Sequence, residues 1–228
     1  MIVGIFGDSF AEPLNTLSWT HLLQNQYEVR NYAKSCTTTF WSYRNLISEI
    51  NNIDVIMFAL TDENRLYHSD IEFREVCTLS TLQHHLDDPN LSMADRAIYE
   101  SAKQYHIHLS DLDFNEFVQA QLVKEIKLLA EQHNKRLIII PAFQKTVQYQ
   151  DIFEISLFEI TRNELYTNFG DFNFRPEQFA TRSNHLSKEN NELLAFKISE
   201  IIKNKIEKVT LGDFVFTKYD NPEIYWRI

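Results

Sequence analysis

Two residues far apart in the chain have the side chains that nucleophilic catalysis requires. Ser9 follows the short apolar run of residues 1–6 and Gly7, so its hydroxyl lies where a buried strand gives way to a turn. His185 lies in a polar loop ahead of a long helical pattern. A serine becomes a nucleophile when a nearby imidazole takes its proton and N–H groups stabilise the oxyanion. If folding brings the two residues together, they predict acyl transfer.

Each residue of this turn also has a structural interpretation. A serine after a strand is frequently the N-cap of a helix. A helix over about residues 14–26 would direct unpaired N–H groups at the Ser9 hydroxyl. Asp8 is expected to bond nearby backbone in the turn and not to act as a catalytic acid. Gly7 permits a close backbone approach and a positive φ, which favours a tight turn here.

Apolar runs that predict buried strands alternate with helical patterns along the chain. Strands are expected at residues 2–6, 27–33, 54–60, 136–141 and 155–161. Helices are expected at about residues 14–26, 41–50, 113–131 and 187–205. This alternation predicts a single α/β domain over residues 1–228, with five parallel strands between two layers of helices.

Residues 66–109 interrupt the alternation and are interpreted as a helical insertion after the third strand. Weak helical patterns at about 71–86 and 92–105 are separated by Pro89. The insertion holds four histidines that invite a metal interpretation: His84, His85, His106 and His108. Adjacent or alternating histidines without cysteine or a carboxylate are a weak ligand pattern, so no metal or other cofactor is expected. Residues 207–228 form an aromatic tail with a possible strand at 213–217.

Composition argues against several functional classes. The chain has 22 basic and 32 acidic residues, and its net charge of −10 disfavours nonspecific nucleic-acid binding and anionic membrane surfaces. No run reaches the roughly 20 apolar residues of a membrane span. The first apolar run lacks the basic flank of a signal peptide, so a cytoplasmic location is the default expectation. Two cysteines do not make a disulfide framework, and four glycines are too few for a nucleotide-binding loop.

The first and last functional segments resemble blocks of the SGNH or GDSL hydrolases. Gly7-Asp8-Ser9-Phe10 resembles the block whose serine is the nucleophile and donates its own N–H to the oxyanion. The segment 182–186 keeps the family's histidine as His185 but has Arg182 in place of the aspartate. The resemblance implies a flavodoxin-like three-layer α/β/α sandwich with strand order 2-1-3-4-5. It also implies hydrolysis or transfer of an acyl ester.

The two middle blocks of the family are altered in this chain. Cys36 stands at the oxyanion glycine, which keeps a backbone N–H but loses glycine's freedom in φ. Thr61 stands at the asparagine donor, and Asn64 is a displaced alternative. Loss of one oxyanion donor typically costs on the order of 10²–10³ in rate, and a neutralised third triad member about 10⁴. The Arg182 carbonyl or a carboxylate such as Asp171 would then orient the histidine.

These blocks favour a serine esterase or acyltransferase that uses a Ser9–His185 dyad or a rewired triad. The substrate implied by the family is a small-molecule or glycan acyl ester, with an O-acetylated carbohydrate the first to test. The insertion 66–109 would then cover the pocket. Aromatic residues near the second block would either stack on a sugar ring or belong to the core, and these are Tyr32, Phe40, Trp41 and Tyr43.

Two alternatives remain open. The substitutions at positions 36, 61 and 182 favour a catalytically silent protein of the same fold that serves as a binding or assembly module. Cys36 would be a reactive thiol if basic groups surrounded it, but no basic cluster is predicted there, so a packed thiol is expected.

Overall fold

The computed structural model describes residues 1–13, 16–67, 78–170, 186–205 and 208–220. Its centre is a parallel sheet of β1 (Ile2–Phe6), β2 (Glu28–Asn31), β3 (Val55–Leu60) and β4 (Arg136–Pro141). In the described part of the chain the sheet has four strands in the order β2-β1-β3-β4. Val3 is paired with Val29 on one side and Val55 on the other. The parallel arrangement and the order of these four strands are as predicted.

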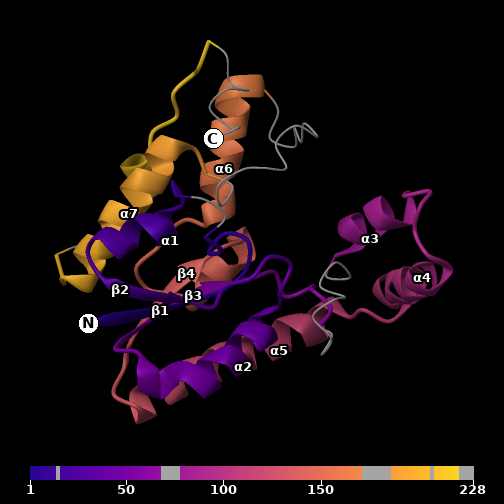
Figure 1. Cartoon of the computed structure of the whole chain (residues 1–228), viewed down its shortest axis with the longest axis horizontal. Helices are drawn as coiled ribbons and strands as arrows, with labels where there is room; N and C mark the ends of the chain where they lie inside the picture. The colour runs from indigo at the N-terminus through magenta and orange to yellow at the C-terminus, as the bar shows by residue number, and fades with distance from the viewer. Residues whose placement is uncertain (14–15, 68–77, 171–185, 206–207, 221–228) are drawn as a thin grey trace.

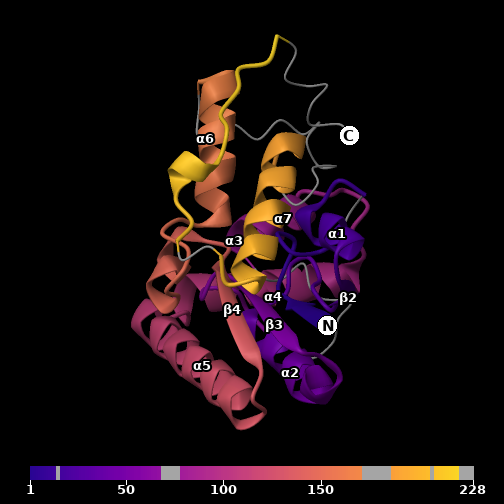
Figure 2. The ribbon, with the colours of Figure 1, turned by 90° about the vertical axis from the view of Figure 1, so that its left-hand side faces the viewer.

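Helices cover both faces of the sheet (Figures 1 and 2). The first face carries α1 (Trp19–Leu22), α6 (Leu157–Phe169) and α7 (Lys188–Ile202), and the second carries α2 (Thr39–Glu49) and α5 (Leu112–Gln132). Short 3-10 helices are η1 (Leu23–Asn25), η2 (Ile50–Asn52), η4 (Gln144–Tyr149) and η6 (Leu211–Asp213). Successive strand residues alternate between two cores: Met57 of β3 packs under the first layer and Phe58 under the second. All six residues of β3 are buried, as expected for a strand covered on both faces.

The predicted fifth strand at residues 155–161 is wrong. Ser156 accepts a hydrogen bond from the N–H of Glu159 at 3.1 Å and caps α6, which begins at the next residue. The apolar run was too short to separate a strand from a helix, and the buried residues of α6 recur at helical spacing up to Leu165.

The predicted strand at residues 213–217 is also wrong. Asp213 is the last residue of η6, and residues 214–217 make no strand pairing. The N–H of Val215 donates instead to the side chain of Asn190 at 2.9 Å. A single parallel bridge joins Phe153 and Val209 nearby. Side-chain contacts with α7 therefore hold this segment in place of a sheet.

The helix expected over residues 14–26 is much shorter than predicted. After Ser9 the chain makes one turn, in which the Asp8 carbonyl accepts from the N–H groups of Ala11 and Glu12 at 3.0 and 2.9 Å. Residues 14–15 lie outside the described ranges, and α1 begins only at Trp19 after its cap Ser18. The expected helix N-terminus directly after Ser9 is therefore wrong.

The insertion contains α3 (Leu79–Leu86) and α4 (Met93–His108), which pack against each other apart from the sheet (Figure 1). Their contact forms a small apolar cluster of its own: Leu82, Leu86, Tyr99 and Ala102. The ring of His85 stacks on Tyr99 at 5.1 Å. Within the described ranges, no three His, Cys, Asp or Glu side chains are grouped to hold a metal ion. The same ranges contain no helix with the length and apolarity needed to cross a membrane.

Candidate active site

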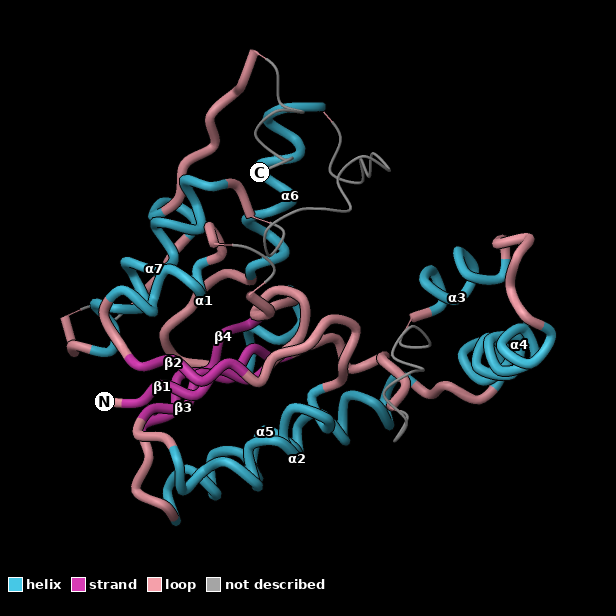
Figure 3. Tube along the Cα trace, in the orientation of Figure 1, coloured by secondary structure: helices cyan, strands magenta, loops and turns pink. Residues whose placement is uncertain are grey.

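Ser9 lies in the turn after β1. The loops that follow the strands gather at one edge of the sheet (Figure 3). It is half-buried. Gly7 makes the turn possible because its φ is 155° and a Cβ there would lie 2.6 Å from the Cβ of Ala59. The Oδ1 of Asp8 accepts from the N–H of Phe10 at 3.1 Å, which confirms that Asp8 bonds nearby backbone. Ser9 is therefore held between two residues whose positions are fixed.

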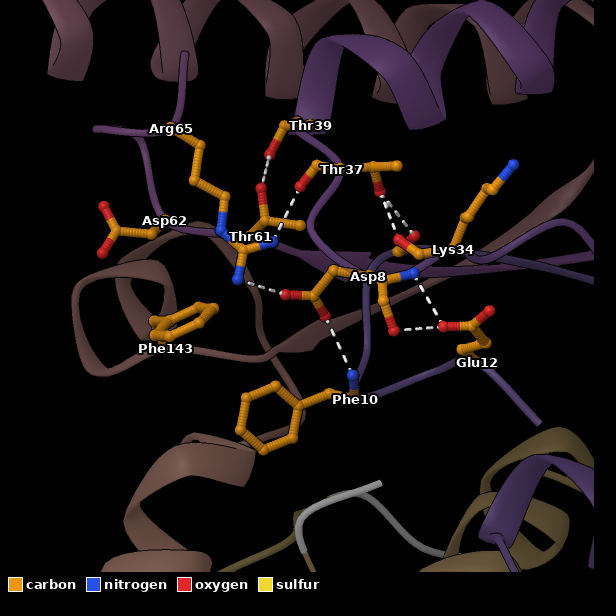
Figure 4. Close-up of polar contacts among 12 residues, drawn as sticks. Asp8, Phe10, Glu12, Lys34, Thr37, Thr39, Thr61, Asp62, Arg65 and Phe143 are labelled. Carbon is orange, nitrogen blue, oxygen red and sulfur yellow. Dashed lines mark hydrogen bonds and ion pairs between the residues drawn. The ribbon is translucent and has the colours of Figure 1, made fainter. Parts of the chain in front are cut away.

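Asp8 also forms a buried ion pair that the sequence did not indicate. Arg65, after β3, places Nη2 at 2.7 Å from the Asp8 Oδ2 (Figure 4). Asp8 is fully buried, and the Arg65 side chain is 8% exposed. Burial raises the pKa of Asp8 above its ordinary value, and the charge of Arg65 opposes that rise. The turn that carries Ser9 is thereby tied to the end of β3.

Cys36 lies in the loop between β2 and α2 and has φ of 59°, a conformation that glycine adopts more readily. The N–H of Lys34 and the hydroxyl of Thr37 both donate to the Gly7 carbonyl, at 3.1 and 3.2 Å. The predicted oxyanion residue Cys36 thus lies in a loop bonded to the turn of Ser9. Cys36 is half-buried, and Cys77 falls outside the described residues.

Two further side chains join the same loop to the turn. The Nδ2 of Asn31 donates to the Ala11 carbonyl at 2.8 Å, and its Oδ1 accepts from the N–H of Ala33 at 2.8 Å. Glu12 accepts from both the N–H and the hydroxyl of Ser35 (Figure 4). The turn after β1 and the loop after β2 therefore form one hydrogen-bonded unit.

Thr61, the predicted substitute for the family's asparagine, is fully buried directly after β3. Its hydroxyl lies 3.2 Å from that of Thr39, and its carbonyl accepts from Nε2 of Gln119 at 3.0 Å. These contacts pair the threonine with the second helical layer. Of the two predicted side-chain donors, Thr61 and Asn64, Asn64 is the less buried.

Asn64 is half-buried in the segment after β3. Its Nδ2 lies 3.0 Å from Oδ1 of Asp62, and its Oδ1 accepts from Nδ2 of Asn115 at 3.4 Å. The side chain is therefore oriented by groups on both sides, one of them at the start of α5.

His185 lies in the range 171–185 that the structure does not describe, as do Asp171 and Arg182. The described chain resumes at Leu186, which is buried. The Leu186 carbonyl accepts from Nδ2 of Asn191 at 3.1 Å. The chain position next to His185 is therefore fixed by α7.

A buried hydrogen-bonded link continues from Asn191 to the first turn. Its Oδ1 accepts from the N–H of Trp19 at 2.9 Å. The indole Nε1 of Trp19 donates to the carbonyl of Phe10 at 2.7 Å. Phe10 follows Ser9, so the residue after the predicted nucleophile and the residue after the predicted base belong to one network. Sequence reasoning missed Asn191, although its place on the apolar face of α7, with Leu194 and Ile198, was the available signal.

A buried carboxylate fixes the start of α7. Glu164 on α6 accepts from the N–H of Ser187 at 3.0 and 3.3 Å and from Nδ2 of Asn190 at 2.6 Å. Asn190 in turn bonds both main-chain groups of Val215. The first turn of α7 is thereby joined to α6 and to the segment after η6.

The aromatic residues near the second block separate into two groups. Tyr32 and Tyr43 pack against the core under α2 and α5, and Tyr32 stacks on Phe6 at 5.1 Å. Phe40 is 38% exposed and meets Tyr67 edge to face at 4.8 Å. The core interpretation is thus confirmed for the two tyrosines, and Phe40 remains at the surface.

No protein-family model and no curated protein matches the sequence. Among solved structures, the chain is similar to the acetyl xylan esterase AlAXEase, with 14% identity, 89% of this chain and 100% of that chain covered, and a TM-score of 0.37. It is similar to the esterase EstA from Pseudoalteromonas sp., with 13% identity, coverage of 89% and 97%, and a TM-score of 0.38. It is also similar to a protein described as a putative lipolytic protein of the G-D-S-L family from Desulfitobacterium hafniense DCB-2. That match has 16% identity, coverage of 88% and 98%, and a TM-score of 0.35.

Proposed function

We propose that this protein is a serine hydrolase of the SGNH type that cleaves or transfers an acyl ester. The buried link from Phe10 through Trp19 and Asn191 to Leu186 carries the proposal. It anchors the chain neighbours of Ser9 and His185 to one network. Nucleophilic catalysis needs Ser9 and His185 to lie close together. The network shared by their chain neighbours supports that requirement, which the sequence separation alone does not.

In the proposed reaction, Ser9 Oγ bonds to the acyl carbon while His185 accepts the hydroxyl proton. The N–H groups of Ser9 and Cys36, with the Asn64 amide or the Thr61 hydroxyl, stabilise the oxyanion. The intermediate then expels the alcohol, which takes the proton from His185. Water or an acceptor hydroxyl releases the acyl group in a second round of the same steps. The φ of 59° at Cys36 supports this role, because the loop keeps the conformation that glycine would give it.

A third group is needed to orient the imidazole of His185. The carbonyl of Arg182 and the carboxylate of Asp171 are candidates from the sequence. Glu164 joins them because its buried carboxylate bonds the N–H of Ser187, two residues beyond the histidine. Replacement Glu164→Gln keeps the shape and removes the charge. The change also weakens the hydrogen bonds to Ser187 and Asn190, so the melting temperature is expected to fall in either case. If Glu164 orients His185, kcat of the folded variant falls by up to about 10⁴, whereas a purely structural role leaves that kcat unchanged.

The test uses the purified full chain with an activated acetyl ester and a fluorophosphonate probe. We expect hydrolysis and labelling by the unmodified protein, and loss of both in Ser9→Ala and His185→Ala. Ser48→Ala is the matched control, because Ser48 is an exposed serine at the far end of α2. Equal activity of Ser9→Ala and the unmodified protein would overturn the assignment.

One observation favours the second candidate, a catalytically silent binding or assembly module. The hydroxyl in the place of the family's donor, Thr61, is buried against Thr39. If the folded protein neither labels nor hydrolyses the ester, this role is supported. Binding of acetylated and unacetylated oligosaccharides, measured by calorimetry, would then examine the glycan as ligand.

A further inference from the structure

The side chain of Arg65, which follows β3, contacts the segments that follow the other three strands of the sheet. Arg65 itself follows β3, and its Nη2 lies 2.7 Å from Asp8, which follows β1. Its Nη1 donates at 2.7 Å to the carbonyl of Thr37, in the loop between β2 and α2. Its guanidinium lies over the ring of Phe143, after β4, at 5.1 Å from the centroid (Figure 4). One side chain thus joins four separate parts of the edge that carries Ser9.

The partners of Arg65 are the chain neighbours of the two predicted oxyanion donors. Asp8 precedes Ser9, and Thr37 follows Cys36. The Thr37 hydroxyl donates to the Gly7 carbonyl at 3.2 Å, so the loop of Cys36 is also bonded directly to the turn of Ser9. A displacement of the guanidinium would therefore move the N–H groups of Ser9 and Cys36 relative to each other.

Stability alone does not explain the placement of this pair. Asp8 is fully buried and Arg65 nearly so, and taking both charges out of water costs energy that their attraction need not recover. An apolar pair of similar volume is frequently at least as stable. A guanidinium can bind a carboxylate and a carbonyl at once in a fixed geometry, which an ammonium group cannot reproduce. The feature that only arginine supplies here is therefore the geometry.

We propose that Arg65 is a positioning residue, whose guanidinium holds the turn of Ser9 and the loop of Cys36 so that their N–H groups converge on one oxyanion. This inference rests on the proposed hydrolase function. Arg65 acts through Asp8 and Thr37 and does not touch the substrate.

The kinetic test compares Arg65→Met with Arg136→Met. Arg136 is the control, because its partly buried guanidinium also bonds two acceptors, the carbonyls of Ile201 and Ile202, but at the opposite end of β4. We expect Arg65→Met to lower kcat on an activated acetyl ester by on the order of 10²-fold, with KM changed less than about threefold. Arg136→Met keeps kcat within about threefold. Arg65→Lys retains one contact, so its kcat should lie between those of Arg65→Met and the unmodified protein. Added guanidinium ion should restore part of the kcat of Arg65→Met. Equal kcat in the two methionine variants would overturn the inference.

A second measurement is independent of catalysis. In a Cys77→Ser background, the rate at which a thiol reagent modifies Cys36 in the folded protein reports how firmly its loop is held. We expect this rate to rise at least about tenfold in Arg65→Met and to stay unchanged in Arg136→Met. An unchanged rate in Arg65→Met contradicts the inference whatever the activity. A raised rate in a protein that never labels with fluorophosphonate supports the anchoring of the loop and contradicts the hydrolase function.

Discussion

Asn191 on α7 accepts a hydrogen bond from the N–H of Trp19 at 2.9 Å, although 172 residues separate them. Both side chains are fully buried. The same amide donates to the carbonyls of Leu186 and Ser187 at 3.1 and 3.0 Å. A single polar side chain on the apolar face of α7 therefore joins the late part of the chain to its first turn.

Replacement Asn191→Ala is expected to destabilise the fold by about 2–4 kcal/mol, because it removes three hydrogen bonds and leaves buried backbone groups without partners. Urea unfolding followed by circular dichroism measures the change. Asn163→Ala is the control, because Asn163 bonds the carbonyl of Glu159 within its own helix and should cost less than about 1 kcal/mol. Equal losses in the two variants would show that the link between Trp19 and α7 adds nothing to stability.

Replacement Gly7→Ala should destabilise the fold by about 2–4 kcal/mol, because it combines an unfavourable φ with overpacking. The added Cβ would lie 2.6 Å from the Cβ of Ala59. The double variant with Ala59→Gly should therefore recover part of the loss. At Gly212 a Cβ would meet nothing closer than 3.7 Å, so Gly212→Ala should leave the unfolding midpoint nearly unchanged. No recovery in the double variant would contradict the predicted clash.

Replacement Cys36→Gly should stabilise the protein relative to Cys36→Ala by about 1 kcal/mol, because glycine adopts φ of 59° without the cost that a Cβ imposes. Comparing glycine with alanine removes the effect of the lost thiol. Asn134→Gly, at φ of 53°, should gain a similar amount over Asn134→Ala, because glycine tolerates this conformation at either position. If Cys36→Ala proves as stable as Cys36→Gly, the loop is not strained at this position.

The stability of the protein should depend on pH through Asp213. Burial alone would raise the pKa of this carboxyl, but hydrogen bonds from Lys197 and Thr210 outweigh burial and lower the pKa below its ordinary value of 3.8. A lowered folded-state pKa adds stability above the unfolded pKa and loses it as pH falls through the folded pKa. Asp213→Asn should thus cost about 1 kcal/mol near neutral pH. This cost should begin to fall only below about pH 4, near the unfolded pKa, and should vanish below the lowered folded-state pKa. Urea midpoints at several pH values measure this effect. Asp151→Asn is the control, because Asp151 is exposed. A loss of stability in Asp213→Asn that does not change with pH would contradict the role given to the Asp213 carboxylate.

The sheet could be predicted from the sequence because its inner strands are nearly uninterrupted apolar runs, as in Val55–Leu60. The run around Leu157 was wrongly predicted as a strand, because its apolar residues fit both the strand period and the helix period. The N-cap Ser156 was the signal that distinguishes a helix here. The start of α5 is likewise decided by a cap: Asp111 caps this helix, which therefore begins at Leu112 and not at the predicted residue 113.

The candidate site could be predicted only in part. The turn of Ser9 and the loop of Cys36 were recognisable because each carries a short local pattern. The partners that hold them were not, because an ion pair such as that of Asp8 with Arg65 depends on contacts between distant segments. Burial of a charged residue leaves no local mark in a sequence, and only the fold brings the two charges together.

The pair of helices α3 and α4 has its own apolar cluster, separate from the two cores of the sheet. Leu66 packs against that cluster and is the chain neighbour of Arg65. The contact between the sheet domain and this helix pair therefore lies one residue from Arg65, whose guanidinium contacts segments that follow the other three strands. A molecule that bound these two helices and displaced Leu66 would therefore act next to the ion pair that joins Arg65 to the turn of Ser9.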